Sequence, residues 1–285
     1  MANQSKMSVF APLKNFSYEG DGEIDLNKDL KITRLAPAMV EEIKESSKRA
    51  SRPLKCNDIE NIRNHFNLYK EILVEKADAQ KAFEEAQEKF SNAVNALILL
   101  RKKNVWIEII YGIIDNRIRS IRLSKKIPDL ICTYKVTKKE ALEFKQWWQN
   151  FCEVLEGNIY FKRALERFSE TKKAQRVDYH LVDYIIAFES LFSEGPGHIR
   201  KKISRRTGVF LAKREMREIC KNMKKAYKLR CDIVHGKKLD YKEINKYYNE
   251  TKNYLRNCLI EIVKRKLVLR NKAIRNNFLK DMDIS

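Results

Sequence analysis

Hydrophobic positions in the second half of the chain recur every three or four residues, as on one face of an amphipathic helix. The clearest run lies between residues 178 and 192, and its apolar side chains are Leu181, Tyr184, Ile185, Phe188, Leu191 and Phe192. Gly195-Pro196-Gly197 follows this run and predicts its end. The same spacing predicts helices at Lys138–Glu156, Ile159–Glu170, Asp178–Phe192, Ile199–Leu211, Arg214–Val234 and Tyr241–Arg270.

The stretch from Leu54 to Tyr111 contains neither glycine nor proline and also shows helical spacing. Its apolar positions are Ile59, Ile62, Phe66, Tyr69 and Leu73, followed by Phe83, Ala86, Phe90, Val94 and Leu97. This pattern predicts long helices. Their apolar face could meet a coiled-coil partner, but packing against the rest of the chain is the simpler interpretation.

The first 35 residues follow a different pattern. Apolar and polar residues alternate in Val9–Ala11, Glu23–Leu26 and Leu30–Ile32, around the turn signal Gly20-Asp21-Gly22. Alternation of this kind predicts short strands or an extended cap. Pro128 and the segment Ile131–Val136 suggest a break, so we expect an N-terminal region at 1–135 and a helical domain at 136–285.

The composition agrees with a mainly α fold. Eight glycines and five prolines in 285 residues are few turn-forming residues for a sandwich or barrel. The longest apolar runs, such as Ala96–Leu100, are too short to span a membrane, and the chain starts without a secretory signal. None of the six cysteines forms a CxxC pair, so we expect a cytoplasmic protein without a metal, cofactor or membrane partner.

The positive charge is concentrated near the C-terminal end. The formal net charge is +21, and residues 201–285 alone contribute +16, from 25 basic and 9 acidic side chains. Clustered cations occur at Arg200–Arg206, Lys221–Arg230 and Lys264–Lys272, with Tyr227, Tyr247, Tyr248 and Tyr254 among them as stacking surfaces. This combination predicts RNA binding by the C-terminal half. The alternative is that the charge only forms a solvated surface.

Candidate acid-base chemistry centres on one of the four histidines. His65, His180 and His198 have plain structural explanations, whereas His235 follows Arg230 by five residues. Arginine can hold a phosphate while histidine moves the proton of a ribose 2′-OH or of the leaving 5′-oxygen. Five residues of helix separate two side chains by about 140°, so the pair converges only where the helix ends or bends, or where two chains meet.

Three ordered segments resemble one family. Arg230 and His235-Gly236, together with Tyr227 and Ile233-Val234, resemble the closing motif of the HEPN (higher eukaryotes and prokaryotes nucleotide-binding) superfamily, Apea-like branch. Asp183–Phe192 resembles the helix of that branch with an alanine and a glutamate, and Ile199–Arg206 resembles its basic helix. The resemblance covers roughly residues 134–240.

The resemblance implies a helical HEPN bundle in the C-terminal half, a homodimer, and a site where the Arg–His pairs of two copies meet. It implies a metal-independent endoribonuclease of a toxin–antitoxin, stress or antiphage defence system, with an antitoxin or other defence protein as a further partner. By position, His235 is the acid-base residue and Arg230 holds the phosphate. The expected RNA-binding side chains are Arg200, Lys201, Lys202, Arg205, Arg206, Lys224, Lys225 and Lys228.

Four residues are expected to support this site. Glu189 could orient Arg230, or could be a helix-flank carboxylate that pairs with any nearby base. Tyr227 and Asp232 flank the arginine, and Cys231 stands where active members carry a polar residue. Two other functions stay open: a non-catalytic HEPN module that binds RNA, nucleotide or protein, and a helical scaffold with acidic partners.

Overall fold

The structure is a computed structural model, and it describes residues 4–20, 22–50, 53–101, 105–115, 117–123, 134–170, 176–195, 197–212 and 214–284. The chain divides into two compact units, which we call unit 1 (residues 1–149) and unit 2 (residues 150–285). The division falls within helix α4 (Lys138–Gly157).

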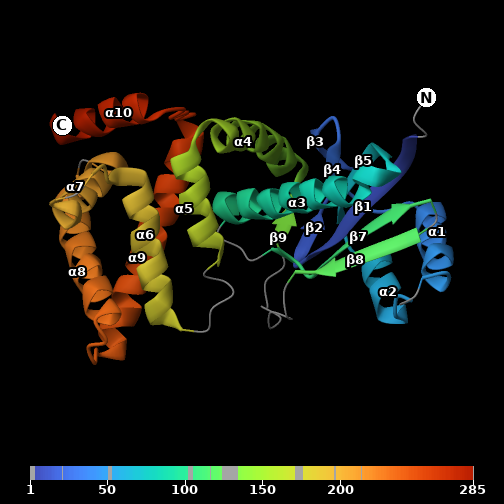
Figure 1. Ribbon diagram of the computed structural model, residues 1–285, viewed down its shortest axis with the longest axis horizontal. Helices are drawn as coiled ribbons and strands as arrows, with labels where there is room; N and C mark the ends of the chain where they lie inside the picture. Colours follow the sequence, from blue (N-terminus) through green and yellow to red (C-terminus); the bar gives the residue numbers. More distant parts are fainter. Residues whose placement is uncertain are drawn as a thin grey trace. The chain divides into compact units, whose positions relative to one another are not determined.

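A seven-stranded antiparallel sheet forms the centre of the described part of unit 1 (Figure 1). The strand order is β3-β4-β5-β1-β7-β8, and β6 pairs with β1 beside this path. The strands are β1 (Gln4–Lys14), β3 (Ile24–Asn27), β4 (Leu30–Thr33), β5 (Asn67–Glu75), β6 (Trp106–Ile107), β7 (Ile109–Ile114) and β8 (Arg117–Arg122). Two further strands, β2 (Phe16–Tyr18) and β9 (Tyr134–Val136), form a small parallel pair.

Helices cover both faces of this sheet. On one face, Phe10 of β1 lies opposite Tyr69 of β5 and Tyr111 of β7, and these rings pack under α1 (Pro37–Lys48) and α2 (Cys56–Asn64). Side chains alternate across a strand, so Gly112 faces the other side. There Phe83 of α3 (Ala79–Arg101) lies so close that a Cβ on Gly112 would be 2.8 Å from its ring.

The expected mainly α fold, with only a few short strands before a helical N-terminal region, is therefore wrong for unit 1. The helical spacing predicted across Phe66, Tyr69 and Leu73 is in fact strand β5, which follows α2 directly. Asn67 explains the change, because its amide donates hydrogen bonds to the carbonyl oxygens of Ile62 (3.0 Å) and His65 (2.8 Å). These bonds satisfy carbonyl groups at the end of α2 without a glycine or proline.

The described residues of unit 2 form helices and the turns that connect them, without a strand. After the end of α4 it contains α5 (Ile159–Glu170), α6 (Val177–Phe192), α7 (Ile199–Leu211), α8 (Met216–Val234), α9 (Tyr241–Lys264) and α10 (Lys272–Ile284). The stripe predicted for the 178–192 helix is confirmed, since Leu181, Tyr184, Ile185, Phe188, Leu191 and Phe192 are all buried. Helix α10 was not predicted. Helix α9 ends shortly before Lys266, which has a positive φ of 48°. Helix α10 then starts beside Asn271, whose side chain accepts a hydrogen bond from the Ile274 amide.

Candidate functional site

Helix α8 carries Arg230 and ends directly before His235. Its buried side is formed by Ile219, Met223, Ala226 and Leu229. Arg230 follows this stripe on the flank that faces α6, and its side chain is about a quarter exposed. Its guanidinium Nη2 lies 3.9 Å from Glu189 Oε1, and its Cζ lies 5.8 Å from the centre of the Tyr227 ring. The structure therefore brings Arg230 together with two of the expected supporting residues.

The contact with Glu189 is an ion pair at long range, too long for a hydrogen bond. The Nε atom of Arg230 is buried and has no hydrogen-bond partner. Burial raises the pKa of the Tyr227 hydroxyl, and the carboxylate of Glu189 adds to the rise. Arg230 thus lies beside a carboxylate and a ring, and its buried Nε is without a hydrogen-bond partner.

His235 closes the same helix and is exposed. Gly236 has a positive φ of 70°. Its amide donates a hydrogen bond to the carbonyl oxygen of Ile233, and the amide of Lys237 donates one to the carbonyl oxygen of Asp232, each at 3.0 Å. This is the Schellman arrangement that ends many helices, and glycine suits it because it tolerates positive φ. The turn fixes where His235 leaves the helix.

Arg230 and His235 do not converge within one chain. The His235 amide still donates to the Cys231 carbonyl oxygen at 3.0 Å, so the helical path continues to this residue. Five helical residues give a separation of about 140° around the axis. A helix that ended between Arg230 and His235 could have brought the two side chains together, but the turn at Gly236 comes after both residues.

The two other supporting residues lie on the His235 side of α8. The Lys237 ammonium donates to Asp232 Oδ1 at 2.6 Å, and this bond holds the pKa of the Asp232 carboxyl below its usual range. Cys231 is half-buried between Arg230 and Asp232 in sequence. Neither residue makes a contact with Arg230 comparable to that of Glu189.

A groove of about 590 Å³ lies between α7 and α8. Six of the eight expected RNA-binding side chains line it: Arg200, Lys201, Arg205, Lys224, Lys225 and Lys228. Two further cations line the groove: Arg217, which the sequence analysis did not name, and Lys221, which it placed in the cluster Lys221–Arg230 but not among the eight expected RNA-binding side chains. The signal that could have found them is their spacing, since Arg217, Lys221, Lys224 and Lys228 recur at helical intervals.

Gly208 allows the two walls of this groove to approach each other. A Cβ at this position would lie 2.9 Å from the Cys220 sulfur and 3.0 Å from the Met216 carbonyl oxygen. Cys220 in turn donates to the Ser204 carbonyl oxygen at 3.1 Å, and burial raises the pKa of its thiol. Met216 and Cys220 line the groove together with the cations.

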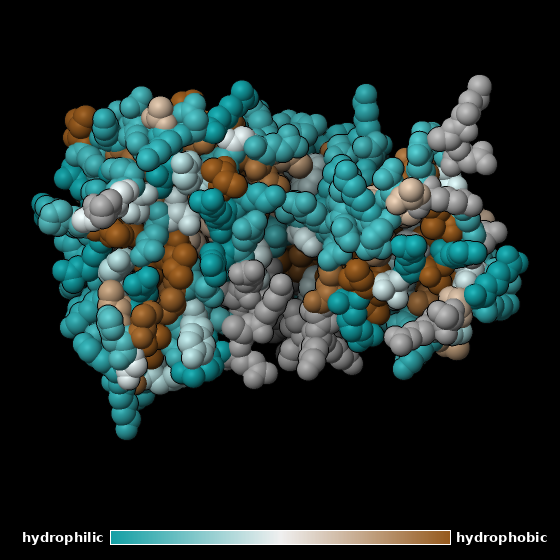
Figure 2. Space-filling view, in the orientation of Figure 1, coloured by the Kyte–Doolittle hydropathy of each residue, from teal (hydrophilic) through white to brown (hydrophobic). Residues whose placement is uncertain are grey.

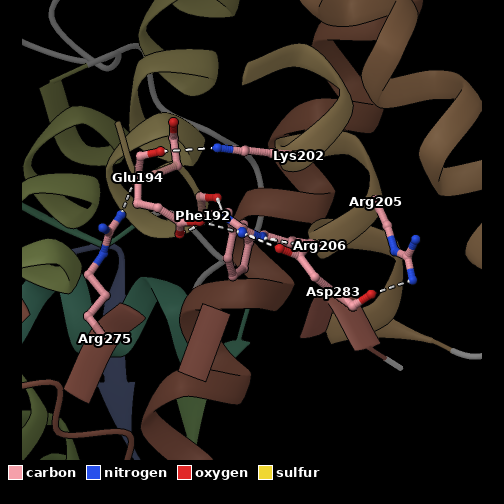
Figure 3. Close-up of polar contacts among 8 residues, drawn as sticks. Phe192, Glu194, Lys202, Arg205, Arg206, Arg275 and Asp283 are labelled. Carbon is pink, nitrogen blue, oxygen red and sulfur yellow. Dashed lines mark hydrogen bonds and ion pairs between the residues drawn. The ribbon is translucent and has the colours of Figure 1, made fainter. Parts of the chain in front are cut away.

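The prediction that Arg206 contacts RNA is wrong. Its side chain is fully buried and bonds to Glu194, to Asp283 of α10 and to the Phe192 carbonyl oxygen (Figure 3). Lys202 also lies outside the groove lining, and its ammonium donates to the Glu194 carbonyl oxygen at 3.3 Å. Both residues hold the segment between α6 and α7.

Arg275 completes this internal network (Figure 3). Its guanidinium donates to the carbonyl oxygens of Ser190 (2.9 Å) and Ser193, and it lies 4.0 Å from the centre of the Tyr160 ring. Two buried arginines, one on α7 and one on α10, thus fix α10 to the end of α6. Sequence reasoning missed this role, since the partners are far apart along the chain.

A second cavity, of about 500 Å³, lies beside the turn that follows His235. Gly236, Lys237 and Lys238 contribute to its wall, together with Tyr179 and Tyr241, whose side chains are 52% and 65% exposed. Exposed tyrosine rings beside cations are groups on which a nucleobase can stack. This cavity was not among the sequence predictions.

Apolar side chains lie exposed near Arg230. Val234 is 57% exposed, and Val182 and Ile186 are half-buried on the side of α6 that also carries Glu189. Figure 2 shows a band of hydrophobic side chains on unit 2, over α6.

Other charged and aromatic candidates have internal partners. Lys264 pairs with Glu261 and Lys266 with Glu153, at 3.1 and 3.6 Å. The rings of Tyr248 and Tyr184 stack with centres 5.6 Å apart. The cluster Lys264–Lys272 therefore has less free charge than its sequence suggests.

In the part of the chain that the structure describes, no three His, Cys, Asp or Glu side chains gather closely enough to hold a metal ion. Within the same residues, no helix combines the length and apolar character needed to cross a membrane. No protein-family model, curated protein or solved structure matches this chain.

Proposed function

We propose that this protein is a HEPN-type endoribonuclease that works without a metal ion and uses Arg230 and His235. The observation that carries the proposal is the end of α8. There an arginine whose side chain is about a quarter exposed lies beside Glu189 and Tyr227, and five residues later an exposed histidine is followed by the Gly236 turn. The motif resemblance supports the same assignment.

The chemistry needs only these side chains and the RNA. His235 takes the proton of a ribose 2′-OH, whose oxygen attacks the adjacent phosphorus, and the bond to the 5′-oxygen breaks. A protonated His235, from the same or the partner copy, gives its proton to that leaving oxygen. Arg230 holds the phosphate oxygens through its paired N–H groups. The products are a 2′,3′-cyclic phosphate and a 5′-hydroxyl.

A homodimer is part of the proposal. The angle of about 140° keeps Arg230 and His235 of one chain apart, so we assign each site an arginine from one copy and a histidine from the other. The exposed side chain of Val234 on α8 and the half-buried side chain of Ile186 on the Glu189 side of α6 support an interface on this side of α6 and α8. We assign the protein to a bacterial defence or stress system, with an antitoxin or defence partner, on the resemblance alone.

The decisive experiment compares wild type with His235→Ala on single-stranded RNA in EDTA. We expect cleavage to fall by about 10²–10⁴-fold, the usual contribution of an acid-base residue. His180→Ala is the matched control, because it removes another histidine of the same unit, one whose ring packs against Tyr248 of α9. Cleavage by His235→Ala at the wild-type rate would remove His235 from the mechanism.

A second candidate function is RNA binding without cleavage. The separation of Arg230 from His235 favours it, as does Cys231 in the place where active members carry a polar residue. This function predicts RNA binding by both wild type and His235→Ala with no cleavage by either. Expression of the two proteins in bacteria gives the same distinction, since only an active ribonuclease arrests growth and degrades total RNA.

A further inference from the structure

The groove between α7 and α8 is lined by positive charge alone. Its charged side chains are Arg200, Lys201, Arg205, Arg217, Lys221, Lys224, Lys225 and Lys228, and no aspartate or glutamate lines it. Among the described residues, none of the five cations from α8 forms an ion pair. Lys228 comes nearest, since its charge helps to lower the pKa of the Asp232 carboxyl after the larger effect of Lys237.

The cations of α8 form a regular row. Arg217, Lys221, Lys224 and Lys228 follow each other at steps of four, three and four residues, so they share one face of the helix. The steps correspond to about 4.5–6 Å along the axis, and the whole row to about 16 Å. His235 lies seven residues beyond Lys228, on the same face and about 10 Å further along.

Unpaired like charges along one groove repel each other, and a bound polyanion relieves this repulsion and releases its own counterions. A row of single cations along one helix follows one sugar-phosphate backbone, as positively charged grooves for single strands do. The two backbones of a duplex cannot both lie in it. The uncharged residues of the lining are Met216 and Cys220, and neither offers an aromatic ring or an amide with which to read a base.

We infer that the α7–α8 groove binds the backbone of single-stranded RNA over three to four consecutive phosphates, without sequence preference, and directs the strand toward His235. Only the last part of this inference rests on the proposed function, since the strand is then cleaved at His235. Any sequence preference of the protein must come from another surface. Arg230, on the other side of α8, takes no part in this binding.

The test measures binding apart from cleavage. All proteins carry His235→Ala, and the probe is a fluorescent 12-nucleotide RNA of mixed sequence, followed by anisotropy over a range of salt concentrations. The groove variant replaces Lys221, Lys224 and Lys228 with glutamine. The control variant replaces Lys242, Lys246 and Lys252 of α9 with glutamine. These lysines are also exposed, and their replacement removes the same amount of charge.

For the groove variant we expect roughly tenfold or greater loss of affinity at physiological salt, and a log–log salt slope smaller by about 2, because each single-strand phosphate contact contributes about 0.7. The control variant should bind within about twofold of the parent. A second mixed sequence should bind equally well, and a 12-base-pair duplex should bind more weakly.

Equal losses in the two variants would overturn the inference, because net charge rather than the groove would then drive binding. Equal affinity for the duplex and the single strand would also overturn it. So would the absence of binding to either RNA, and an acidic protein would then be the better occupant of the groove. The outcome is independent of the proposed function. Binding that depends on the groove, in a wild-type protein that cleaves nothing, would keep this inference and reject the ribonuclease.

Discussion

Arg230 and His235 leave helix α8 about 140° apart, because five residues separate them and the helix keeps its path up to His235. One chain therefore cannot place both side chains on one phosphate. A shared site across two copies makes a clear prediction for mixed dimers.

Arg230→Ala and His235→Ala should each be inactive alone, yet active when coexpressed. In a twofold dimer the mixed species has one intact site of two, so the purified mixed dimer should show about half of the wild-type activity, and a random mixture about a quarter. The measurement is RNA cleavage by dimers purified through two different affinity tags. No recovery in a verified mixed dimer would contradict the shared site.

Glu189→Gln should affect cleavage more than stability. The ion pair with Arg230 is 3.9 Å long and both side chains are about a quarter exposed, so its loss should cost less than about 1 kcal/mol of unfolding free energy. A displaced Arg230 should nevertheless lower kcat by about tenfold, since a 1 Å misplacement can cost up to about 10²-fold.

Asp183→Asn is the matched control for Glu189. It lies on the same helix, is equally exposed and pairs with Arg167 at 3.3 Å, away from α8. If both variants lower kcat equally, Glu189 has no special role in positioning Arg230. Urea unfolding of both proteins separates a loss of activity from a loss of fold.

Arg206→Met should destabilise unit 2 strongly. The variant leaves the Phe192 carbonyl oxygen and the partly exposed carboxylates of Glu194 and Asp283 without their partner, a change that costs about 1–3 kcal/mol. Thermal unfolding followed by far-ultraviolet circular dichroism reports on the helices of this unit. Arg205→Gln, which loses a bond to the Asp283 carbonyl oxygen at the surface, should cost less than about 1 kcal/mol. Similar melting temperatures for the two variants would show that the network is not needed for stability.

Unit 1 should lose stability as the pH falls below neutral, and His65 should contribute to the loss. Burial lowers the pKa of His65 from its usual value near 6.5, and the charge of Lys14 lowers it further. The unfolded chain then binds the proton more readily, so the contribution of His65 is complete above about pH 6.5 and declines toward the folded-state pKa.

Tryptophan fluorescence isolates this effect, because Trp106, Trp147 and Trp148 all lie in unit 1. Urea unfolding at pH 7.5 and pH 5.5 should show a larger fall for wild type than for His65→Gln. An equal fall in both proteins would assign the pH dependence to other groups.

The helices of unit 2 could be predicted because each has a long apolar stripe, and the 178–192 stripe is buried as expected. The sheet of unit 1 could not. Strand β5 is buried on both faces from Asn67 to Lys70, so it lacks the alternation that marks a half-exposed strand. Its apolar residues then continue the helical spacing of α2 by coincidence, and helix α2 ends where the side chain of Asn67 binds its last carbonyl groups.

The candidate site was predictable where it depends on one helix, as for the cations and the Arg–His pair of α8. It was not predictable where it depends on distant partners. Arg206 has the same sequence signature as Arg205, yet its burial follows from Glu194 and Asp283, which lie 12 and 77 residues away. Net charge by segment cannot separate a surface cation from one inside an ion-pair network.

The bond between Arg206 and Asp283 also orders events during synthesis. A ribosome that has made the chain up to residue 270 has produced both walls of the basic groove but not Asp283. In this nascent chain Arg206 lacks one of its two carboxylates, whereas every strand of the unit 1 sheet is already present. Unit 2 therefore reaches its stable form only after Asp283 has been made, later than the sheet of unit 1, and helix α7 is not held to α10 before that point.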